Sequence, residues 1–390
     1  MANISFLVEY FPGGGVERVI MNLAQPLAER GHKIFLFVHH LNRKNIPSGL
    51  PIEYIELPYS ALSSRNCDMV RQAILDRNID IFFSVGRFPK YLPKLRNEGI
   101  CKLAFVLHNQ PFYETMEKWG QIIRPKKKTI GEWVKRYLIN YPKFKLGYYD
   151  RKMNKRYSTI YNAVDGYGVL FEDYGRMLTE KLGIPLDESK CVVLQNPIPA
   201  PQNIDLTQSR EKRIVYVGRL DYWQKRVDRL LAVWELIHAK FPEWRLSIVG
   251  SGAELEALQN IVKNNNLPRV EFLGFVPDPT SIYATSEILC LTSTVEGCPM
   301  VLIEAQLCGC ATMAFDCCSG VRDILSPNWE SGVYVEDNNI KAYAEALARL
   351  MSDDKLRAEI QKNSIENAKR FSVETSAEHY HALIERLMLN

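Results

Sequence analysis

The sequence predicts an α/β protein made of two doubly wound, Rossmann-like domains, and three observations support this prediction. The chain has 390 residues, too many for one ordinary core but enough for two domains of roughly 200 residues each. Short runs rich in Val, Ile, Leu and Phe alternate with segments of helical periodicity along its whole length. Such runs are typical of parallel strands that helices cover on both faces.

This alternation predicts the positions of the strands and helices in both halves of the chain. We expect strands over residues 3–9, 33–40, 79–85, 102–108 and 166–171 in the first half, and over 213–218, 245–250, 270–274 and 287–293 in the second. Amphipathic helices lie between them, the first of them starting near Val16. Residues 191–213 are dense in Pro, Asn, Gln and Ser, which predicts domains over 1–196 and 197–373. A last helix, 374–390, is free to pack back on the first domain.

Composition narrows the class of protein. Hydrophobic residues make up 46% of the chain and charged residues 24%, as in soluble globular proteins. No apolar run approaches the ~18 residues of a membrane span, and the N-terminus lacks the basic region of a signal peptide, so we expect a cytosolic protein. The nine cysteines have no zinc-finger spacing and predict reduced, buried thiols.

Candidate binding residues follow predicted strands. Ligands of doubly wound sheets bind beyond the carboxyl ends of the strands, so a cleft between two facing domains is the expected site. Gly13, Gly14 and Gly15 follow the first strand and precede a helix whose free N–H groups suit an anion. Arg18 takes the place of the last glycine of a dinucleotide fingerprint, which counts against an oxidoreductase. His108 ends another strand, although a lone histidine is more often structural.

The first loop of the second domain is basic. Arg219 and Lys225 stand six residues apart, and a guanidinium with an ammonium could clamp a diphosphate. A solvated basic loop is the alternative.

Two glutamates stand eight positions apart in the stretch TSTVEGCPMVLIEAQLCGC. Pro299 suits the first turn of a helix, so Glu296 lies on a loop and Glu304 on a helix of apolar neighbours that leave it no solvated face. A carboxylate on a largely buried helix needs a strong partner. Sugar hydroxyls would serve as that partner, and a buried ion pair is the alternative.

These motifs together resemble the family-4 retaining glycosyltransferases of the GT-B fold, as found in bacterial cell-surface glycan assembly. The resemblance rests on the E-x7-E pattern after LTS, on VGRLDYWQKR, GFVPDP and GGGVERV. It covers nearly the whole chain, and residues 111–156 are its least typical part. It implies that residues 1–196 bind the acceptor and 197–373 the donor, with the two domains facing across a cleft.

The resemblance also implies roles for the candidate residues. Glu304 binds the donor ribose, Glu296 lies against the transferred sugar, and Arg219 with Lys225 stabilises the leaving diphosphate. The loop at Gly14 and Gly15 approaches the phosphates, and His108 lies near the reacting sugar, so His108, Arg219, Lys225 and Glu296 form the expected catalytic set. Further donor contacts are expected at Val276, Cys298, Pro299, Met300 and Val301.

The implied reaction moves a hexose from a nucleotide sugar, with UDP the expected nucleotide, and retains the anomeric configuration. No D-x-D pair follows a strand, which agrees with transfer that needs no metal and no cofactor. In the family the leaving phosphate takes the acceptor's proton, so Glu296 is not assigned as a nucleophile. Two alternatives stay open: a nucleotide-sugar 2-epimerase, which would act on the donor alone, and a non-catalytic GT-B protein, against which the intact motif residues argue.

A basic, aromatic insert spans about residues 111–157. Residues 124–157 contain twelve Lys and Arg against Glu132 and Asp150, a net charge of +10 in a chain of +4, so the remainder carries −6. Aromatic residues recur within it, and Pro142 is expected to interrupt its helix. The docking residues we expect are Lys126, Lys127, Lys128, Trp133, Lys135, Arg136 and Tyr137.

Basic residues with an aromatic stripe suit an anionic membrane surface. We therefore expect a cytoplasmic protein docked on the inner face of the membrane, near a glycan or lipid-linked acceptor of polysaccharide, lipopolysaccharide or capsule synthesis. The insert could equally hold an anionic glycan, or be a solvated helix whose aromatic residues pack on the first domain. Nucleic acid is not expected, since nothing else in the chain resembles a nucleic-acid module.

Overall fold

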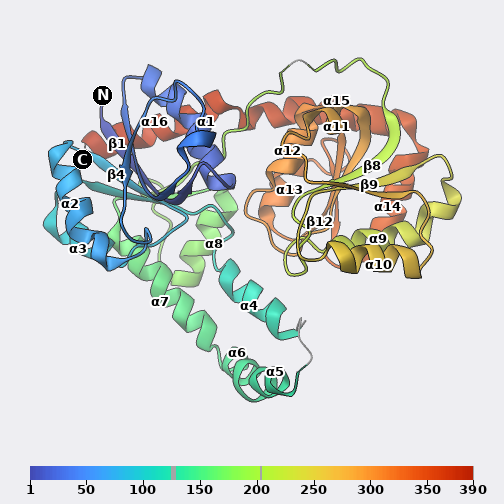
Figure 1. Cartoon of the computed structure of the whole chain (residues 1–390), viewed down its shortest axis with the longest axis horizontal. Coiled ribbons are helices and arrows are strands. Elements are labelled where there is room, and N and C mark those ends of the chain that lie inside the picture. The colour runs from blue at the N-terminus through green and yellow to red at the C-terminus, as the bar shows by residue number, and fades with distance from the viewer. Residues whose placement is uncertain (124–128, 203, 390) are drawn as a thin grey trace. The chain divides into compact units, whose positions relative to one another are not determined.

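The computed structural model describes residues 1–123, 129–202 and 204–389, and the chain divides into two compact units. Unit 1 consists of Met1–Thr115, Lys135–Pro199 and Phe371–Asn390, and unit 2 of Met116–Val134 and Ala200–Arg370. Each unit contains one parallel sheet with helices (Figure 1). The prediction of two doubly wound α/β domains is therefore confirmed.

The sheet of unit 1 has seven parallel strands in the order β3-β2-β1-β4-β5-β6-β7. They are β1 (Asn3–Phe11), β2 (Lys33–Leu41), β3 (Ile52–Glu56), β4 (Ile81–Val85), β5 (Lys102–Val106), β6 (Gly166–Val169) and β7 (Cys191–Val193). The order reverses between β1 and β4, so the loops that follow these strands diverge there. Such a switch point is where open α/β sheets bind ligands.

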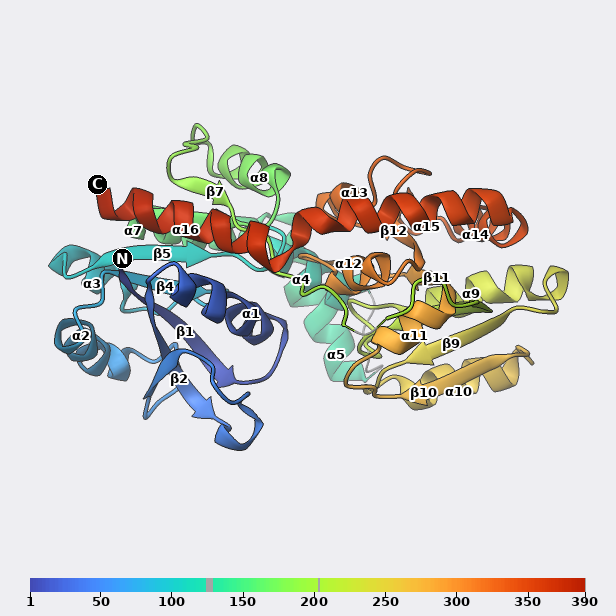
Figure 2. The ribbon, with the colours of Figure 1, turned by 90° about the horizontal axis from the view of Figure 1, so that it is seen from above.

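Two helices from opposite ends of the chain cover one face of this sheet. They are α1 (Gly15–Glu29) and α16 (Val373–Leu389), which lie side by side (Figures 1 and 2). The α16 residues Tyr380, Leu383, Ile384 and Leu387 recur at spacings of one, three and four, and they are buried in one core with α1 and the strands. Unit 1 also contains α2 (Cys67–Asp76), α3 (Leu92–Glu98), α7 (Tyr148–Ala163) and α8 (Glu172–Leu182).

Unit 2 has six parallel strands in the order β10-β9-β8-β11-β12-β13. They are β8 (Glu211–Val217), β9 (Arg245–Val249), β10 (Val270–Gly274), β11 (Ser286–Leu291), β12 (Ala311–Asp316) and β13 (Val333–Glu336). Its helices include α9 (Val227–Ile237), α10 (Leu255–Asn264), α11 (Thr280–Thr285), α12 (Met300–Leu307), α13 (Ser319–Leu325), α14 (Ile340–Ser352) and α15 (Asp354–Ala368). Here the order reverses between β8 and β11.

The insert is mostly helical where it is described. It comprises α4 (Tyr113–Ile123), α5 (Ile130–Val134), a π-helical stretch over Lys135–Asn140 and α6 (Tyr141–Lys145). Helical backbone continues from Ile130 through Lys145, so the prediction that Pro142 interrupts it is wrong. Pro142 lies in the first turn of α6, and the chain turns instead at Gly147, whose φ is 67°.

Two expectations from composition can be compared with the structure. All nine cysteines are free thiols that are buried or partly buried, as predicted. In the described part of the chain, no helix has the length and apolar character needed to cross a membrane.

Candidate active site

Two predicted residues of unit 2 meet at the carboxyl ends of its central strands. Lys225 lies on the loop after β8 and Glu296 on the loop after β11, the strand next to β8. Lys225 Nζ lies 2.6 Å from Glu296 Oε1, although the residues are 71 positions apart. The side chains are only 18% and 9% exposed, so this is a largely buried, charge-assisted hydrogen bond.

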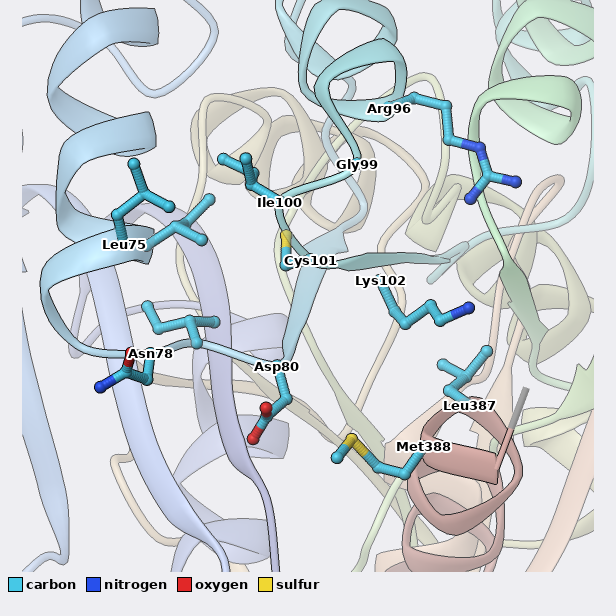
Figure 3. Close-up of a pocket in the computed structure, with 12 residues that line it drawn as sticks. Leu75, Asn78, Asp80, Arg96, Gly99, Ile100, Cys101, Lys102, Leu387 and Met388 are labelled. Atoms are coloured by element: carbon cyan, nitrogen blue, oxygen red, sulfur yellow. The ribbon is translucent and has the colours of Figure 1, made fainter.

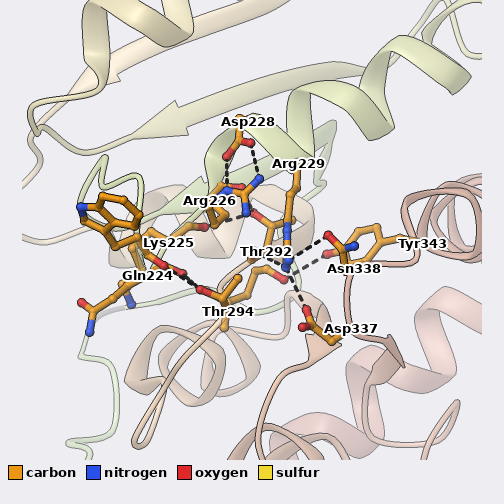
Figure 4. Close-up of polar contacts among 12 residues, drawn as sticks. Gln224, Lys225, Arg226, Asp228, Arg229, Thr292, Thr294, Asp337, Asn338 and Tyr343 are labelled. Carbon is orange, nitrogen blue, oxygen red and sulfur yellow. Dashed lines mark hydrogen bonds and ion pairs between the residues drawn. The ribbon is translucent and has the colours of Figure 1, made fainter. Parts of the chain in front are cut away.

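Backbone contacts hold the Lys225 loop in place (Figure 4). Asp221 Oδ1 accepts the N–H groups of Trp223 and Gln224 at 2.8 and 2.9 Å. From the β11 loop, the Thr294 hydroxyl donates to the Trp223 carbonyl at 2.7 Å, and the Thr292 hydroxyl to the Arg226 carbonyl at 3.0 Å. The two loops therefore form one rigid frame around Lys225.

Arg226 ends this loop and begins α9. Its φ is 48°, and its guanidinium binds both carboxylate oxygens of Asp228 at 2.8 and 2.7 Å. In the first turn of α9, the buried Arg229 donates to Asp337 and Asn338 at 2.8 and 3.0 Å (Figure 4). These contacts anchor the start of α9 to the loop after β13.

Arg219 is held differently from Lys225. It is exposed, and its Nη2 donates to Gln224 Oε1 at 2.7 Å, within the same loop. Its carbonyl accepts the buried Tyr216 hydroxyl at 2.9 Å, which fixes the backbone but leaves the guanidinium at the surface.

Glu304 lies on α12 and is less buried than expected. Its neighbours Leu302, Ile303 and Ala305 are buried, but Glu304 itself is partly exposed, so the prediction that it has no solvated face is wrong. Glu304 Oε2 accepts the Tyr283 hydroxyl at 3.3 Å. Burial, and next the Glu304 carboxylate, raise the pKa of Tyr283 well above its usual range, so the phenol remains the donor.

The other residues predicted to contact the donor lie between Glu296 and Glu304 or on the loop that follows β10. Pro299 is the residue before α12, and the Met300 N–H donates to the Cys298 carbonyl at 2.9 Å. Val301 lies in the first turn of α12, and Val276 follows β10 beside Phe275, which is 71% exposed. The N-terminus of α12 thus follows Glu296 directly.

The glycine loop of unit 1 leads into α1. Gly14 is the residue before α1, and none of Gly13, Gly14 and Gly15 has a positive φ. A Cβ atom on Gly13 would meet only Tyr10 Cβ, at an ordinary 3.8 Å, so the fold itself does not require glycine there. A Cβ on Gly14 would lie 3.1 Å from Glu17 Oε2, a carboxylate to which the sequence analysis gave no role.

His108 follows β5 in unit 1 and is held by a residue that the sequence analysis missed. Its Nδ1 lies 3.0 Å from Oδ1 of the buried Asn196, so the Nδ1–H donates and Nε2 carries the lone pair. Nε2 is buried without a hydrogen-bond partner in the described structure. Burial lowers the pKa of His108 to about 4, which keeps the ring neutral at pH 7.

The structure thus groups the predicted residues by unit. Gly14, Gly15 and His108 lie after β1 and β5 in unit 1, and the expected donor residues lie on the loops and on α12 of unit 2. Lys126, Lys127 and Lys128 lie outside the described residues. Four supporting residues were not predicted: Asp221, Thr292, Thr294 and Asn196. The first three stand at or after predicted strands, which is the one signal that could have found them, whereas Asn196 follows β7, a strand that the sequence did not predict.

A cavity of about 460 Å³ lies at the opposite edge of the unit 1 sheet (Figure 3). Its lining comes from the segments before β4 and β5 and from the end of α16, and includes Asp80, Arg96, Cys101, Lys102 and Met388. None of the predicted site residues lines it.

Two family models match adjacent parts of the chain. The model described as Glycosyltransferase Family 4 matches residues 13–200, and that of Glycosyl transferases group 1 matches residues 201–367. The chain belongs to glycosyltransferase family 4.

Relatives of this family-4 glycosyltransferase occur in several bacteria. An uncharacterized glycosyltransferase of Haemophilus influenzae is 32% identical over 197 residues, which cover 50% of this chain and 55% of that protein. The chain spans about half the length of the curated relatives that match it with more than 30% identity. An alpha-1,4-N-acetyl-D-galactosaminyltransferase of Campylobacter jejuni, named for an undecaprenol-diphosphate-linked glycan, is 24% identical over 98% of both chains.

Solved structures share the fold. The crystal structure of Anabaena HepE in complex with UDP matches the family-4 chain with a TM-score of 0.73 and 17% identity, over 98% of this chain and 99% of that one. Staphylococcus aureus TarM matches with a TM-score of 0.74 and 15% identity, over 98% of both chains. The fold is GT-B, as the resemblance implied.

Proposed function

We propose that this protein is a retaining glycosyltransferase that moves a hexose from a UDP-linked donor to a lipid-linked glycan in bacterial cell-surface synthesis. The observation that carries the proposal is the buried Lys225–Glu296 pair at the switch point of the unit 2 sheet, with Arg219 on the same loop. The names of relatives support the substrates: HepE was crystallised with UDP, and the Campylobacter enzyme is named for an undecaprenol-diphosphate-linked acceptor.

Donor binding would change the partners of Lys225. In the structure the Lys225 ammonium is bound to Glu296. A diphosphate carries more negative charge than one carboxylate, so it would compete with Glu296 for this ammonium. The guanidinium of Arg219 would bind the same diphosphate. Glu296 would then turn its oxygens to hydroxyls of the transferred sugar, while Glu304 accepts from the ribose.

The same cations support bond cleavage. As the bond between the anomeric carbon and the phosphate breaks, negative charge grows on the leaving diphosphate, where Arg219 and Lys225 stabilise it without a metal. The acceptor hydroxyl attacks on the same face and gives its proton to the leaving phosphate. We assign the Gly14–Gly15 loop to the donor phosphates, and the neutral His108, whose Nε2 can accept a hydrogen bond, to the reacting sugar.

A panel of nucleotide sugars, each with and without a lipid-linked acceptor, tests the proposal. We expect one UDP-hexose to be consumed, the product to keep the donor's anomeric configuration by NMR, and the rate to be unchanged by EDTA. Epimerisation of the donor without acceptor would instead support the 2-epimerase. Tight binding of the nucleotide without any turnover would support a non-catalytic protein.

The insert supports docking on an anionic membrane. In unit 1, α6 and the first half of α7 extend away from the sheet (Figure 1). We call five residues the basic helical surface: Lys135, Leu138, Lys143, Lys145 and Leu146. All five are exposed, Leu138 to 66% and Leu146 to 71%. Leucines exposed next to lysines suit a helix that lies in a membrane interface, where each cation adds ~1 kcal/mol.

Sedimentation with anionic and neutral vesicles tests this docking. Wild type should bind anionic vesicles at low salt and release them at high salt. The pair Leu138→Ser and Leu146→Ser, and the pair Lys143→Glu and Lys145→Glu, should each weaken binding. Leu206→Ser is the matched control, because Leu206 is 44% exposed in unit 2. Equal sedimentation of all these variants would remove the basic helical surface from membrane binding.

A further inference from the structure

We propose that unit 1 holds a divalent transition-metal site formed by Glu9, His39 and His40. Glu9 lies near the end of β1, and the two histidines near the end of the neighbouring β2. Each residue offers one ligand atom, and these atoms all lie within 4.8 Å of one another. Among the described residues, no other group of three His, Cys, Asp or Glu side chains brings its ligand atoms this close together.

Contacts from one loop orient two of the three ligands. His39 Nδ1 lies 2.9 Å from the Leu57 carbonyl, so the Nδ1–H donates there and Nε2 keeps the lone pair that a metal needs. The Ser60 hydroxyl and the Ala61 N–H both donate to Glu9 Oε2, at 3.0 and 2.9 Å. Outer contacts of this kind are what fixes the ligands of protein metal sites.

The buried Glu9 carboxylate keeps its other oxygen for a cation. Glu9 is only 8% exposed, and both of its hydrogen bonds go to Oε2. In the described chain no ion pair joins Glu9 to either imidazole, so this charge is not neutralised by a neighbouring cation. A buried carboxylate without a cationic partner is costly, and a bound metal ion would offset that cost.

His40 gives the site access to solvent. It is exposed, its ring stacks on Tyr10 with centroids 4.8 Å apart, and the centroids of His39 and His40 are 4.1 Å apart. Stacking orients the His40 ring without using its nitrogens. An ion can therefore reach the site from outside, and a position opposite the protein ligands stays open to water.

The ligand set selects the class of metal. Two imidazoles and one carboxylate suit Zn²⁺ or a related first-row ion, whereas Mg²⁺ and Ca²⁺ prefer oxygen ligands. Bonds of about 2.0–2.1 Å would draw the three ligand atoms together to roughly 3.4 Å. Glu9 and the exposed His40 side chain would supply that small movement.

A second histidine cluster provides the control. His32 Nε2 lies 2.8 Å from His381 Nδ1, and His381 Nε2 lies 3.4 Å from Glu385. These nitrogens already bind one another or a carboxylate, so we assign no metal to them. His381→Gln removes a histidine from the same unit without touching Glu9, His39 or His40.

Zinc titration of the metal-free full chain, followed by calorimetry, tests the site. Wild type and His381→Gln should bind zinc equally, and Mg²⁺ should not compete. His40→Gln should abolish this binding, and Ser60→Ala should weaken it roughly 10-fold or more by releasing Glu9. Co²⁺ in the wild-type site should give visible absorption that His40→Gln removes.

Because His40 is exposed, its variant keeps the fold, which circular dichroism verifies. The proposal is overturned if the wild type binds no zinc, or if binding survives His40→Gln but is lost with His381→Gln. The readout is metal binding without donor or acceptor, so the result does not depend on the proposed transfer reaction.

Discussion

At the residue scale, the contact between Lys225 and Glu296 bears both on the proposed binding of the donor and on the stability of unit 2. Their side chains are mostly out of water and 2.6 Å apart, whereas Arg219 on the same loop is exposed. Removal of one member of a buried pair leaves the other charge unpaired, while an exposed cation can be removed at little cost to the fold. Removal of Lys225 should therefore lower the free energy of unfolding, whereas removal of Arg219, the other cation proposed to bind the diphosphate, should not.

We expect Lys225→Ala to lower both kcat and the free energy of unfolding, the latter by about 1–3 kcal/mol, because Glu296 loses its hydrogen bond to the Lys225 ammonium. Arg219→Ala should lower kcat alone. Thermal unfolding and steady-state kinetics of both variants check this. If Lys225→Ala keeps the wild-type Tm, the ion pair does not stabilise unit 2; if Arg219→Ala keeps the wild-type kcat, Arg219 does not act on the diphosphate.

Glu304→Gln should weaken the binding of UDP. A neutral amide replaces an acceptor whose hydrogen bond to the ribose is charge-assisted, and such bonds contribute ~1.5–3 kcal/mol. Tyr283→Phe is the matched control, since it removes only the hydroxyl that donates to Glu304 Oε2. Calorimetry should show a Kd at least several-fold higher for Glu304→Gln than for Tyr283→Phe. Equal values for the two variants would take Glu304 away from the ribose.

His108 should make unfolding depend on pH. Its pKa is about 4 in the folded chain against a usual 6.5, because burial disfavours the charged ring. The unfolded chain therefore binds the proton first, and stability present above pH 6.5 is lost as the pH falls towards 4. The stability lost is at most about 3.5 kcal/mol, because the pKa differs by about 2.5 units and each unit corresponds to about 1.4 kcal/mol.

Denaturant unfolding of wild type and His108→Gln between pH 7 and pH 4 measures this term. The difference in unfolding free energy between the two proteins should change across that range, with the wild type losing more stability. Parallel curves would mean that His108 is not held neutral in the folded state.

The sequence indicated the candidate side chains, but not the residues whose hydrogen bonds hold them in place. Arg219, Lys225, Glu296 and His108 could be found because they stand on loops after strands. Asn196 is 88 positions from His108, and its role depends on a tertiary contact that no local pattern reveals. The partial exposure of Glu304 likewise depends on how α12 packs, and not on its apolar sequence neighbours.

At the element scale, long apolar runs predicted the strands well. All nine expected strands exist, including β1, β4 and β11. Four further strands, β3, β7, β12 and β13, lie where the sequence predicted none. Of these, β7 has only three residues and lies where Pro and Asn density suggested a boundary, and β3 has two glutamates among its five residues. These strands are set by pairing with a neighbour already in the sheet.

Two glycines after strands should respond in opposite ways to a methyl group. Gly250 follows β9 with a φ of 140°, and a Cβ there would come to 1.9 Å from the Gly218 carbonyl oxygen. Gly13 follows β1 with room for a Cβ. Gly250→Ala should therefore lower the Tm by several degrees, since the loop between β8 and α9 must move.

Gly13→Ala should keep the Tm and instead raise the KM, because its methyl group occupies space that we assign to substrate. Differential scanning fluorimetry and steady-state kinetics compare the two variants. An unchanged KM for Gly13→Ala would remove the glycine loop from the binding site.

At the scale of the whole molecule, the chain closes unit 1 with its last helix. Residues 200–370 form most of unit 2, and α16 then completes the unit 1 core, which starts at residue 2. The sequence predicted a final helix, but its apolar stripe would suit any open sheet face, so its place was not determined by pattern. Gly166 on β6 makes room for it: a Cβ there would lie 3.2 Å from Leu383 Cδ1.

Leu383→Ala should therefore destabilise the N-terminal sheet although it lies at the C-terminus. Leu383 is 1% exposed, and its truncation should cost about 2–5 kcal/mol, whereas Leu389→Ala is the control because Leu389 is 89% exposed on the same helix. Hydrogen exchange measured by mass spectrometry separates the units: amides of β1 and β4 should exchange faster in Leu383→Ala, and those of β8 and β11 should not change. Faster exchange in β8 and β11 instead would mean that α16 stabilises unit 2, and identical exchange in Leu383→Ala and Leu389→Ala would mean that α16 contributes nothing to the unit 1 core.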